Sequence, residues 1–499
     1  MTVRPAGCRA RVFYSDMPMK PTWKLLWTML LFAAGSVSLF AATPAAPWSH
    51  GHLQASPDGR YLMHADGTPF FWLADTAWLL PERLDRDETV YYLNRCRDAE
   101  FNVIQVQTVN GVPAFNRYGA SSMPCGFDFS DTDTQGGYGY WEHMDFIVDE
   151  AARRGIYVGM VCIWGGLVNA GAMNEAEARA YGTFLGERYR NRPNIVWIIG
   201  GDTRGDVKRE VWEALARAIR TADPDHAMTF HPRGRYCSAE WFADAEWLDF
   251  HMFQSGHRRY GQRNGDKEYP IPDNTEEDSW RYVERSRALA PRTPVLDGEP
   301  SYEAIPQGLH DPAQGLWQAH DVRRYAYWSV FAGACGHTYG HNSVMQFFRP
   351  GVVPAYGATI PWHEALQAEG RNQMKHLRRL IEAFPYFERR GDQQFLCGEN
   401  GERYARVIAT RGEDYALVYS CTDAPFTVDL RRPTGRTKRA WWYSPRTGRL
   451  YPIGTLRGDT ATFRPAEAPA EELFDENSVG DDWVTIIADA EKEYTKILE

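Results

Sequence analysis

Residues 193–202 form an apolar run that is bounded by a proline at one end and by two glycines and an aspartate at the other. The run reads Pro-Asn-Ile-Val-Trp-Ile-Ile-Gly-Gly-Asp, and its branched side chains favour a strand that is buried on both faces. Such strands belong to parallel sheets that are covered by helices. The stretch therefore predicts an α/β fold. Asp202 would lie just past the carboxyl end of the strand, where parallel α/β folds hold their ligands.

Strand-like and helix-like segments alternate along the chain up to residue 386. The predicted strands are 69–75, 101–107, 156–163, 193–202, 227–231, 248–254, 294–300 and 335–340. The predicted helices are 85–99, 140–154, 174–190, 207–221, 275–290, 321–333 and 362–383. Eight strand–helix units predict a (β/α)8 TIM barrel over residues 47–386. A doubly wound open sheet is the alternative, and the count of eight favours the closed barrel.

The sequence pattern changes near residue 387, after which no long helical pattern occurs. Short runs of small, β-branched and aromatic residues predict strands instead. They are 404–410, 414–419, 426–430, 440–443, 461–463 and 482–487, followed by a charged tail at 488–499. Residues 387–499 are therefore predicted to form a small antiparallel β domain, most simply a β-sandwich.

The N-terminal region, residues 1–46, has the layout of a secretory signal. Lys20 and Lys24 precede an apolar run over 25–40, and small residues follow at 41–46. We expect a secreted or periplasmic protein. The run is short for a membrane span, so a retained signal anchor is the weaker alternative. Met17 or Met19 lies closer to the basic residues than Met1 and is the expected start of translation.

Composition and missing motifs exclude several classes of function. The net charge is −10 and no Lys/Arg-rich face is evident, so nucleic acid is not an expected partner. No HExxH, GxSxG or phosphate-loop motif occurs, and no pair of cysteines has zinc-site spacing. We therefore predict no metal and no cofactor. Cys162 and Cys335 lie in apolar runs and are expected to be buried thiols. The sequence predicts neither disulfides nor the oligomeric state.

Two carboxylates at predicted strand ends form a candidate catalytic pair. Asp202 ends strand four and Glu299 ends strand seven, and they are 97 residues apart (299 − 202). A barrel uses about 31 residues per strand–helix unit, so this separation matches three units. Glycoside hydrolysis needs two carboxyl groups on a rigid frame, and barrel strand ends provide one. The alternatives are a helix cap for Asp202 and an arginine pair for Glu299; Glu303 competes with Glu299.

Other polar and aromatic residues lie at or near the predicted strand ends. Together they predict a polar pocket with aromatic surfaces, as a sugar site requires. Each alone is weak evidence, because a histidine at a strand end is more often structural and Asp75 is also suited to cap a helix. The predicted substrate contacts are Asp75, Trp78, Gln105, Gln107, Trp164, His251, Gln254, Glu303, His337, Tyr339 and His341.

Four motifs resemble the apiosidase-like glycoside hydrolases, glycoside hydrolase family 140. They are Phe-Trp-Leu-Ala-Asp-Thr-Ala-Trp at 71–78, Phe-Asn-Val-Ile-Gln at 101–105, the strand-four run at 194–202, and Glu-Pro-Ser-Tyr-Glu at 299–303. The likeness extends over about residues 53–487 and implies a (β/α)8 barrel followed by a β domain sometimes labelled collagen-binding. Nothing in the sequence indicates collagen affinity, so that label is not carried over.

The resemblance implies a retaining, exo-acting β-apiosidase that acts on rhamnogalacturonan side chains of plant pectin. It implies that Asp202 is the acid/base and Glu299 the nucleophile. The chain departs from the wider clan of retaining barrel enzymes, which carry Asn-Glu where this chain has Gly201 and Asp202. The substrate is therefore open: another exo- or endo-glycosidase, such as another furanosidase, is one alternative. A non-catalytic carbohydrate-binding protein on the same barrel is the other.

The proposed acid must be protonated near neutral pH. Burial of Asp202, or the charge of Glu299 beside it, would hold its pKa up.

Overall fold

The computed structural model describes residues 46–130, 137–262, 277–469 and 482–498. Residues 46–499 form one compact unit. The predicted signal segment lies outside the described residues, apart from Ala46. No helix within the described ranges has the length and apolar character that a membrane crossing requires.

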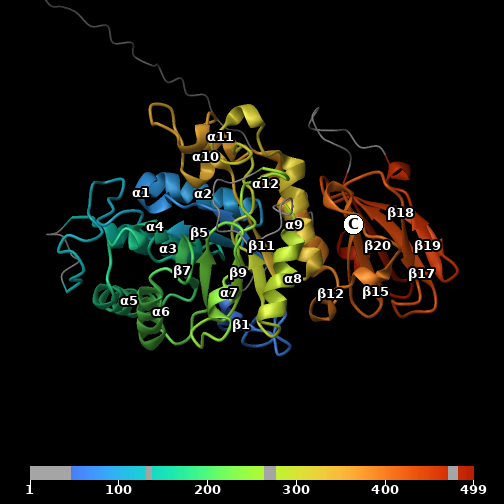
Figure 1. Cartoon of the computed structure of the whole chain (residues 1–499), viewed down its shortest axis with the longest axis horizontal. Coiled ribbons are helices and arrows are strands. Elements are labelled where there is room, and N and C mark those ends of the chain that lie inside the picture. The colour runs from blue at the N-terminus through green and yellow to red at the C-terminus, as the bar shows by residue number, and fades with distance from the viewer. Residues whose placement is uncertain (1–45, 131–136, 263–276, 470–481, 499) are drawn as a thin grey trace, which may run out of the picture. The chain divides into compact units, whose positions relative to one another are not determined.

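Eight parallel strands form the central sheet (Figure 1). Their order is β8-β7-β6-β5-β4-β11-β10-β9. The sheet closes between its two end strands, where the Asp249 N–H donates to the Met228 carbonyl at 2.8 Å. The predicted barrel is therefore confirmed over the open sheet. The strands are β4 (Trp72–Thr76), β5 (Val103–Gln107), β6 (Tyr157–Val161), β7 (Ile195–Thr203), β8 (Met228–Pro232), β9 (His251–Phe253), β10 (Val295–Asp297) and β11 (Gly336–Tyr339).

Helices follow the strands much as the sequence predicts. The long ones are α2 (Arg86–Asp98), α3 (Tyr140–Ala152), α5 (Glu175–Tyr189), α6 (Arg209–Ala222), α8 (Ser279–Leu289), α9 (Ala319–Ala332) and α12 (Glu369–Glu382). The short ones, which the sequence pattern did not show, are α1 (Leu80–Arg83), α4 (Gly165–Asn169), α7 (Ala239–Phe242) and α10 (Asn342–Met345).

The single long helix predicted over 362–383 is wrong. It divides into α11 (Trp362–Ala365) and α12. The backbone of Ala368 leaves the helical conformation between them, with φ −51° and ψ 139°. The buried Glu303 carboxylate accepts the N–H groups of Gly370 and Arg371 at 3.2 Å each. A carboxylate at this end compensates the exposed N–H groups and the positive end of the helix dipole. The tertiary contact thus overrides the continuous helical periodicity.

A small antiparallel sheet precedes the barrel. Its strands are β1 (Leu53–Ala55), β2 (Leu62–His64) and β3 (Pro69–Phe70). The run predicted as one strand at 69–75 is therefore two strands in different sheets. The sequence missed this sheet because its strands are too short to show an alternating pattern.

Two antiparallel sheets form the C-terminal β-sandwich. The larger has the order β12-β14-β15-β20-β17-β18 and the smaller β13-β16-β19. Strand β18 was not predicted because Pro452 and Gly454 interrupt it and much of it is exposed. The strands are β12 (Arg390–Gly391), β13 (Leu396–Cys397), β14 (Ile408–Arg411), β15 (Tyr415–Ser420), β16 (Phe426–Asp429), β17 (Lys438–Tyr443), β18 (Leu450–Leu456), β19 (Thr460–Phe463) and β20 (Trp483–Asp489).

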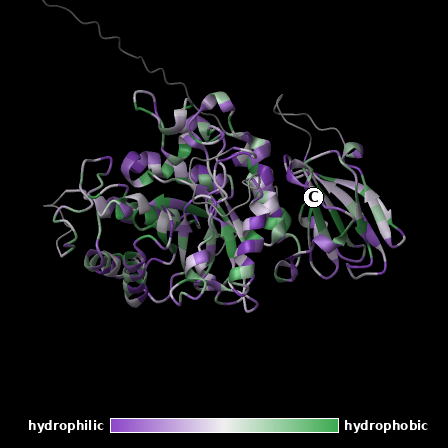
Figure 2. Ribbon diagram, viewed as in Figure 1, coloured by the Kyte–Doolittle hydropathy of each residue, from purple (hydrophilic) through white to green (hydrophobic). Residues whose placement is uncertain are grey.

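The larger sheet of the sandwich contacts two hydrophobic cores. Alternate residues of β15, such as Leu417 and Tyr419, belong to the barrel's core, whereas Val418 belongs to the core inside the sandwich. Tyr419 stacks on Tyr327 of α9 with ring centroids 4.8 Å apart. Successive strand residues point to opposite faces, so the strand is buried on both sides. Figure 2 shows hydrophobic residues along these strands and the central barrel strands.

Asp482 joins the sandwich to the barrel through a buried ion cluster. Its carboxylate accepts two bonds from Arg323 of α9, at 2.9 and 3.0 Å, and one from Arg446 at 2.9 Å. The Tyr419 hydroxyl donates to it at 3.1 Å. Burial alone would raise the pKa of Asp482, but the two guanidinium groups outweigh it and lower the pKa to about 2.

We expect Asp482→Asn to lower the free energy of unfolding at pH 7 by about 3–5 kcal/mol, because two buried guanidinium charges lose their carboxylate. Urea unfolding measures this change. The lowered pKa means that the contribution is present above the ordinary pKa of 3.8 and is lost as the pH falls toward 2. Arg179→Ala, which removes an exposed pair with Glu175, is the control and should leave the midpoint unchanged. An equal midpoint for Asp482→Asn would contradict the account.

Candidate active site

A cavity of about 510 Å³ opens at the carboxyl ends of the barrel strands. Asp202 and Glu299 both line it. Of the predicted substrate contacts, Trp78, Gln107, Trp164 and Gln254 line it as well. The cavity thus brings together residues from β7 and β10 that lie far apart in the sequence.

A bulge at the end of β7 presents Asp202 to the cavity. Gly200 pairs with His231 of β8 and Thr203 pairs with Pro232, so Gly201 and Asp202 are extra residues in the ladder. Gly200, Gly201 and Asp202 have φ of 87°, 110° and 48°. A Cβ on Gly201 would lie 2.8 Å from the Trp164 ring. The two glycines are therefore needed for both the backbone conformation and the close approach, and they leave Asp202 exposed to the cavity.

Glu299 lies two residues past β10 and is only 6% exposed. The Gln105 side-chain amide, inside the barrel, donates to the carbonyl of Gly298 at 2.9 Å and so fixes the backbone next to Glu299. One carboxylate oxygen lies 3.1 Å from His257 Nε2 and the other 3.2 Å from His231 Nε2. One imidazole therefore faces each oxygen of this carboxylate, and the His257 contact has the geometry of a hydrogen bond.

His231 contacts both halves of the pair. The backbone N–H of Asp202 donates to His231 Nδ1 at 3.3 Å. A nitrogen that accepts a hydrogen bond carries no proton, so the neutral ring is protonated on Nε2, the atom that faces Glu299. One ring thus joins the bulge of β7 to the carboxylate after β10.

The surroundings push the two carboxyl pKa values apart. Although the Asp202 side chain faces the open cavity, the protein atoms around it desolvate its carboxyl group and raise its pKa to about 6, and the charge of Glu299 adds to this rise. Both causes expected from the sequence are present. Burial would also raise the pKa of Glu299, but His231 and His257 outweigh it and lower that pKa to about 2. Between these values the pair contains one protonated and one ionised carboxyl group, the division that acid–nucleophile chemistry requires.

Aromatic and cationic side chains form part of the remaining wall. The rings of Trp78 and Trp164 lie 5.5 Å apart, and the Trp78 indole N–H donates to the Tyr302 hydroxyl at 3.1 Å. Tryptophan faces of this kind suit sugar rings. Three arginines, Arg233, Arg235 and Arg258, line the cavity.

The other predicted substrate contacts do not line the cavity. The rule that polar residues at strand ends point into the site, here called the strand-end rule, is therefore wrong for them. Asp75 is fully buried between the barrel and its helices, where it pairs with Arg371 at 2.9 Å. The Glu303 carboxylate accepts hydrogen bonds from the Tyr339 hydroxyl at 2.5 Å and from the Gly370 N–H at the start of α12. Because it serves these groups outside the cavity lining, it is not an alternative to Glu299 as the catalytic carboxylate. Gln105 lies deeper and supports Gly298.

The three remaining histidines also lie off the cavity lining. His251 bonds Ser238 at 2.9 Å, next to α7, and His341 accepts the Ser343 N–H at 3.0 Å at the start of α10. His337 is fully buried. Burial lowers the pKa of each, to about 4 for His251 and about 3 for the other two. Nearness to a strand end does not tell whether a side chain points into the cavity.

The sequence reasoning missed the residues that touch the pair. His231 closes the predicted fifth strand, and applying the strand-end rule there would have found it and Arg233. Tyr302 belongs to the strand-seven motif at 299–303, but nothing in the sequence pattern placed it in the site. His257 lies in an irregular loop after β9 and had no sequence signal. In the parts of the chain that the structure describes, no cluster of three or more His, Cys, Asp or Glu side chains has the form of a metal site.

Comparison with known proteins decides the family. Residues 56–388 match the model described as "Apiosidase-like, catalytic domain". The chain belongs to the apiosidase-like glycoside hydrolases. Residues 391–488 of this glycoside hydrolase match a second model, described as "Putative collagen-binding domain of a collagenase". No curated protein matches the chain.

Two solved structures are similar to this glycoside hydrolase over nearly its whole length. One, described as a glycoside hydrolase, is 57% identical, with a TM-score of 0.86 over 90% of this chain and 99% of its own. The other is a family 5 glycoside hydrolase from Bacteroides vulgatus, 56% identical, with a TM-score of 0.87 over 91% of this chain and 96% of its own. The chain is therefore a glycosidase, and the non-catalytic alternative is dropped.

The opposed pKa shifts predict the pH dependence of this glycoside hydrolase. We expect kcat/KM to be flat from about pH 3 to 6 and to fall about tenfold per pH unit above about 6, as Asp202 loses its proton. Steady-state kinetics on a cleavable aryl glycoside measure the profile. The residual activity of Asp202→Asn should lack the descending limb. A wild-type profile that stays flat to pH 8 would contradict the assignment.

Proposed function

We propose that this enzyme is a retaining, exo-acting glycosidase of plant pectin, and specifically a β-apiosidase that acts on rhamnogalacturonan side chains. The observation that carries the reaction type is the pair of carboxyl groups in one cavity with oppositely shifted pKa values. The observation that supports the substrate is the cationic and aromatic wall around them, together with membership of the apiosidase-like family.

In the first step, Glu299 attacks the anomeric carbon and the bond from that carbon to the glycosidic oxygen breaks. The Asp202 carboxyl proton passes to that oxygen, so the leaving group departs as an alcohol. Glu299 is suited to this attack because its low pKa keeps it ionised. His231 and His257 hold the carboxylate in one orientation, which lowers the entropic part of the barrier.

In the second step, water attacks the same carbon and displaces the Glu299 carboxylate. The Asp202 carboxylate, now ionised, removes a proton from that water and regains its acid form. Two displacements at one carbon restore the original anomeric configuration. A carboxyl group whose pKa lies near 6 is suited to give and take a proton in turn.

The arginines suggest the character of the substrate. Guanidinium groups bind carboxylates in a bidentate manner, and pectin is rich in uronic acids. Arg233, Arg235 and Arg258 line the same cavity as Asp202. An acidic sugar next to the cleaved residue would be held there, while Trp78 and Trp164 contact sugar rings. The cavity volume suits one or two sugar units and favours exo action. Another furanosidase on an acidic glycan is the second candidate.

The substrate is a polymer of the cell wall, which is too large to reach an enzyme kept inside a cell. Together with the basic, apolar and small-residue layout of residues 1–46, this supports export as part of the proposal.

Two substitutions test the assigned roles. Asp202→Asn should lower turnover by about 10²–10⁴-fold, because it removes general acid–base catalysis. Glu299→Gln should lower it at least as much, because it removes the nucleophile. The matched control is Glu175→Gln at an exposed site on α5, which should behave as wild type. Circular dichroism checks that the fold is intact. Near-wild-type turnover in either variant would remove that residue from the mechanism.

The stereochemistry of the product tests the double displacement. We expect proton NMR of the first-formed sugar to show the anomeric configuration of the substrate, before mutarotation. Inversion would rule out a glycosyl-enzyme on Glu299. Product analysis on a panel of acidic pectic and neutral glycans then tests the substrate. Release of apiose from acidic pectic oligosaccharides is the expected result, and cleavage confined to neutral glycans would contradict it.

A further inference from the structure

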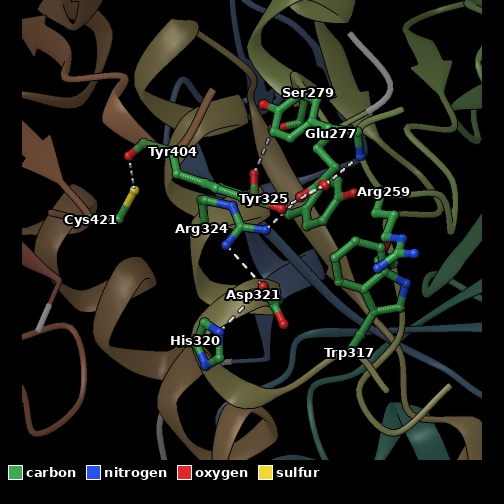
Figure 3. A network of polar contacts seen from close by, with 12 residues as sticks. Arg259, Glu277, Ser279, Trp317, His320, Asp321, Arg324, Tyr325, Tyr404 and Cys421 are labelled. Carbon is green, nitrogen blue, oxygen red and sulfur yellow. Dashed lines mark hydrogen bonds and ion pairs between the residues drawn. The ribbon is translucent and has the colours of Figure 1, made fainter. Parts of the chain in front are cut away.

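A tyrosine of the C-terminal sandwich region reaches a loop of the active site. Tyr404, between β13 and β14, donates its hydroxyl to a Glu277 carboxylate oxygen at 2.8 Å. The same oxygen accepts the backbone N–H of Tyr260 at 2.7 Å. Tyr260 belongs to the loop that follows β9 of the barrel. One carboxylate therefore bridges the C-terminal region and this loop (Figure 3).

The bridge is held in place by further charges. The second oxygen of Glu277 pairs with Arg324 of α9 at 2.8 Å, and Arg324 also pairs with Asp321 at 2.9 Å. The guanidinium of Arg324 lies over the Tyr404 ring, 4.6 Å from its centroid. The Tyr404 ring contacts the Tyr260 ring edge-on at 5.2 Å. Tyr404 thus meets the loop through both its hydroxyl and its ring.

The loop that Tyr404 contacts also carries His257. Tyr260 lies three residues after His257. The His257 carbonyl accepts the Trp317 indole N–H at 3.1 Å and the Gly308 N–H at 2.6 Å. Its side chain lies 3.1 Å from the Glu299 carboxylate. The described contacts therefore run from Tyr404 through Glu277 and Tyr260 to the loop that orients the nucleophile.

We propose that the C-terminal β-sandwich is a working part of the active site: Tyr404 is a positioning residue that holds the His257 loop through Glu277, and so orients Glu299. The inference rests on the proposed role of Glu299. Other contacts between sandwich and barrel, such as Tyr419 on Tyr327 and Asp482 on Arg323, act on the middle of α9 and touch no residue of the cavity lining. Tyr404 differs from these residues because it contacts the His257 loop. Its neighbour Arg403 also lies over the Tyr260 ring, 5.3 Å from the centroid, but Tyr404 alone of the two donates a hydrogen bond to Glu277 among the described contacts.

The test compares Tyr404→Phe with Tyr494→Phe in the full chain. Tyr404→Phe removes the hydroxyl and keeps the ring over Arg324. Tyr404 is 46% exposed, so the change leaves no buried hole and the variant should fold. Tyr494→Phe removes a hydroxyl that donates to Asp414 at 3.0 Å within the C-terminal region, and is the matched control.

We expect Tyr404→Phe to lower kcat about 10-fold with KM nearly unchanged, less than the ~100-fold that a 1 Å misplacement produces. Amide hydrogen exchange in the peptide that contains residues 255–260 should speed up. Tyr494→Phe should match wild type in all of these measurements.

The pH profile separates positioning from general destabilisation. Among the described residues, six titratable groups surround Glu299. They are His231 from β8, His257 from the loop after β9, Asp202 from β7, Asp297 at the end of β10, Tyr302 from the segment after β10, and Tyr356 on the cavity wall. If only the His257 contact loosens, the pKa of Glu299 should rise toward its ordinary value. As the pH falls from 5 to 3, Glu299 would then become protonated and kcat/KM should decrease, which wild type does not show.

The inference is overturned if Tyr404→Phe has the kcat of wild type, or if Tyr494→Phe loses as much kcat as Tyr404→Phe. It is also overturned if Tyr404→Phe lowers kcat without faster hydrogen exchange at 255–260 and without the acidic decrease in kcat/KM. Failure of the proposed function is a separate result. In that case Glu299→Gln would keep its activity, whereas failure of this inference alone would leave Glu299→Gln inactive and Tyr404→Phe normal.

Discussion

The contact of one histidine ring with two distant segments is the constraint on which the site depends. His231 accepts the Asp202 N–H through one nitrogen and faces the Glu299 carboxylate with the other. The ring therefore fixes the bulge that carries Asp202, the proposed acid, and faces Glu299, the proposed nucleophile. It is fully buried, so its tautomer is set by these neighbours and not by water. The barrel supplies the frame, because β7 and β8 are adjacent strands and β10 reaches the same cavity.

The bulge at the end of β7 explains how a short aspartate side chain reaches the cavity, where we propose that it acts as the acid. Gly201 and Asp202 are extra residues in the β7 ladder, and such an insertion re-aims the side chain that follows. Positive φ angles at both glycines and at Asp202 allow the backbone itself to project toward the cavity. The strain of a non-glycine residue at positive φ is of the kind found at functional sites. The projecting backbone therefore brings the carboxyl group of Asp202 to the cavity without a longer side chain.

Much of the fold, and the central pair, followed from the sequence, because long apolar runs and helical periodicity report burial directly. Each predicted barrel strand has a counterpart, and strand ends in parallel folds converge, so Asp202 and Glu299 could be placed together. The same rule failed for Asp75 and Glu303, since a carboxylate at a strand end serves a helix or an arginine equally well. His257 could not be predicted, because only the folded loop brings it to Glu299.

The C-terminal sandwich shares the barrel's hydrophobic core, and Tyr404 reaches Glu277 beside the His257 loop, so the sandwich packs as part of the same unit as the barrel. The central claim is that Glu299 forms the covalent bond to the sugar. Trapping the enzyme with a slow 2-fluoro glycoside and sequencing the labelled peptide by mass spectrometry tests it most directly. The account predicts a single sugar on Glu299. A label on Glu303 or another carboxylate, or inactivation without any covalent adduct, would contradict it.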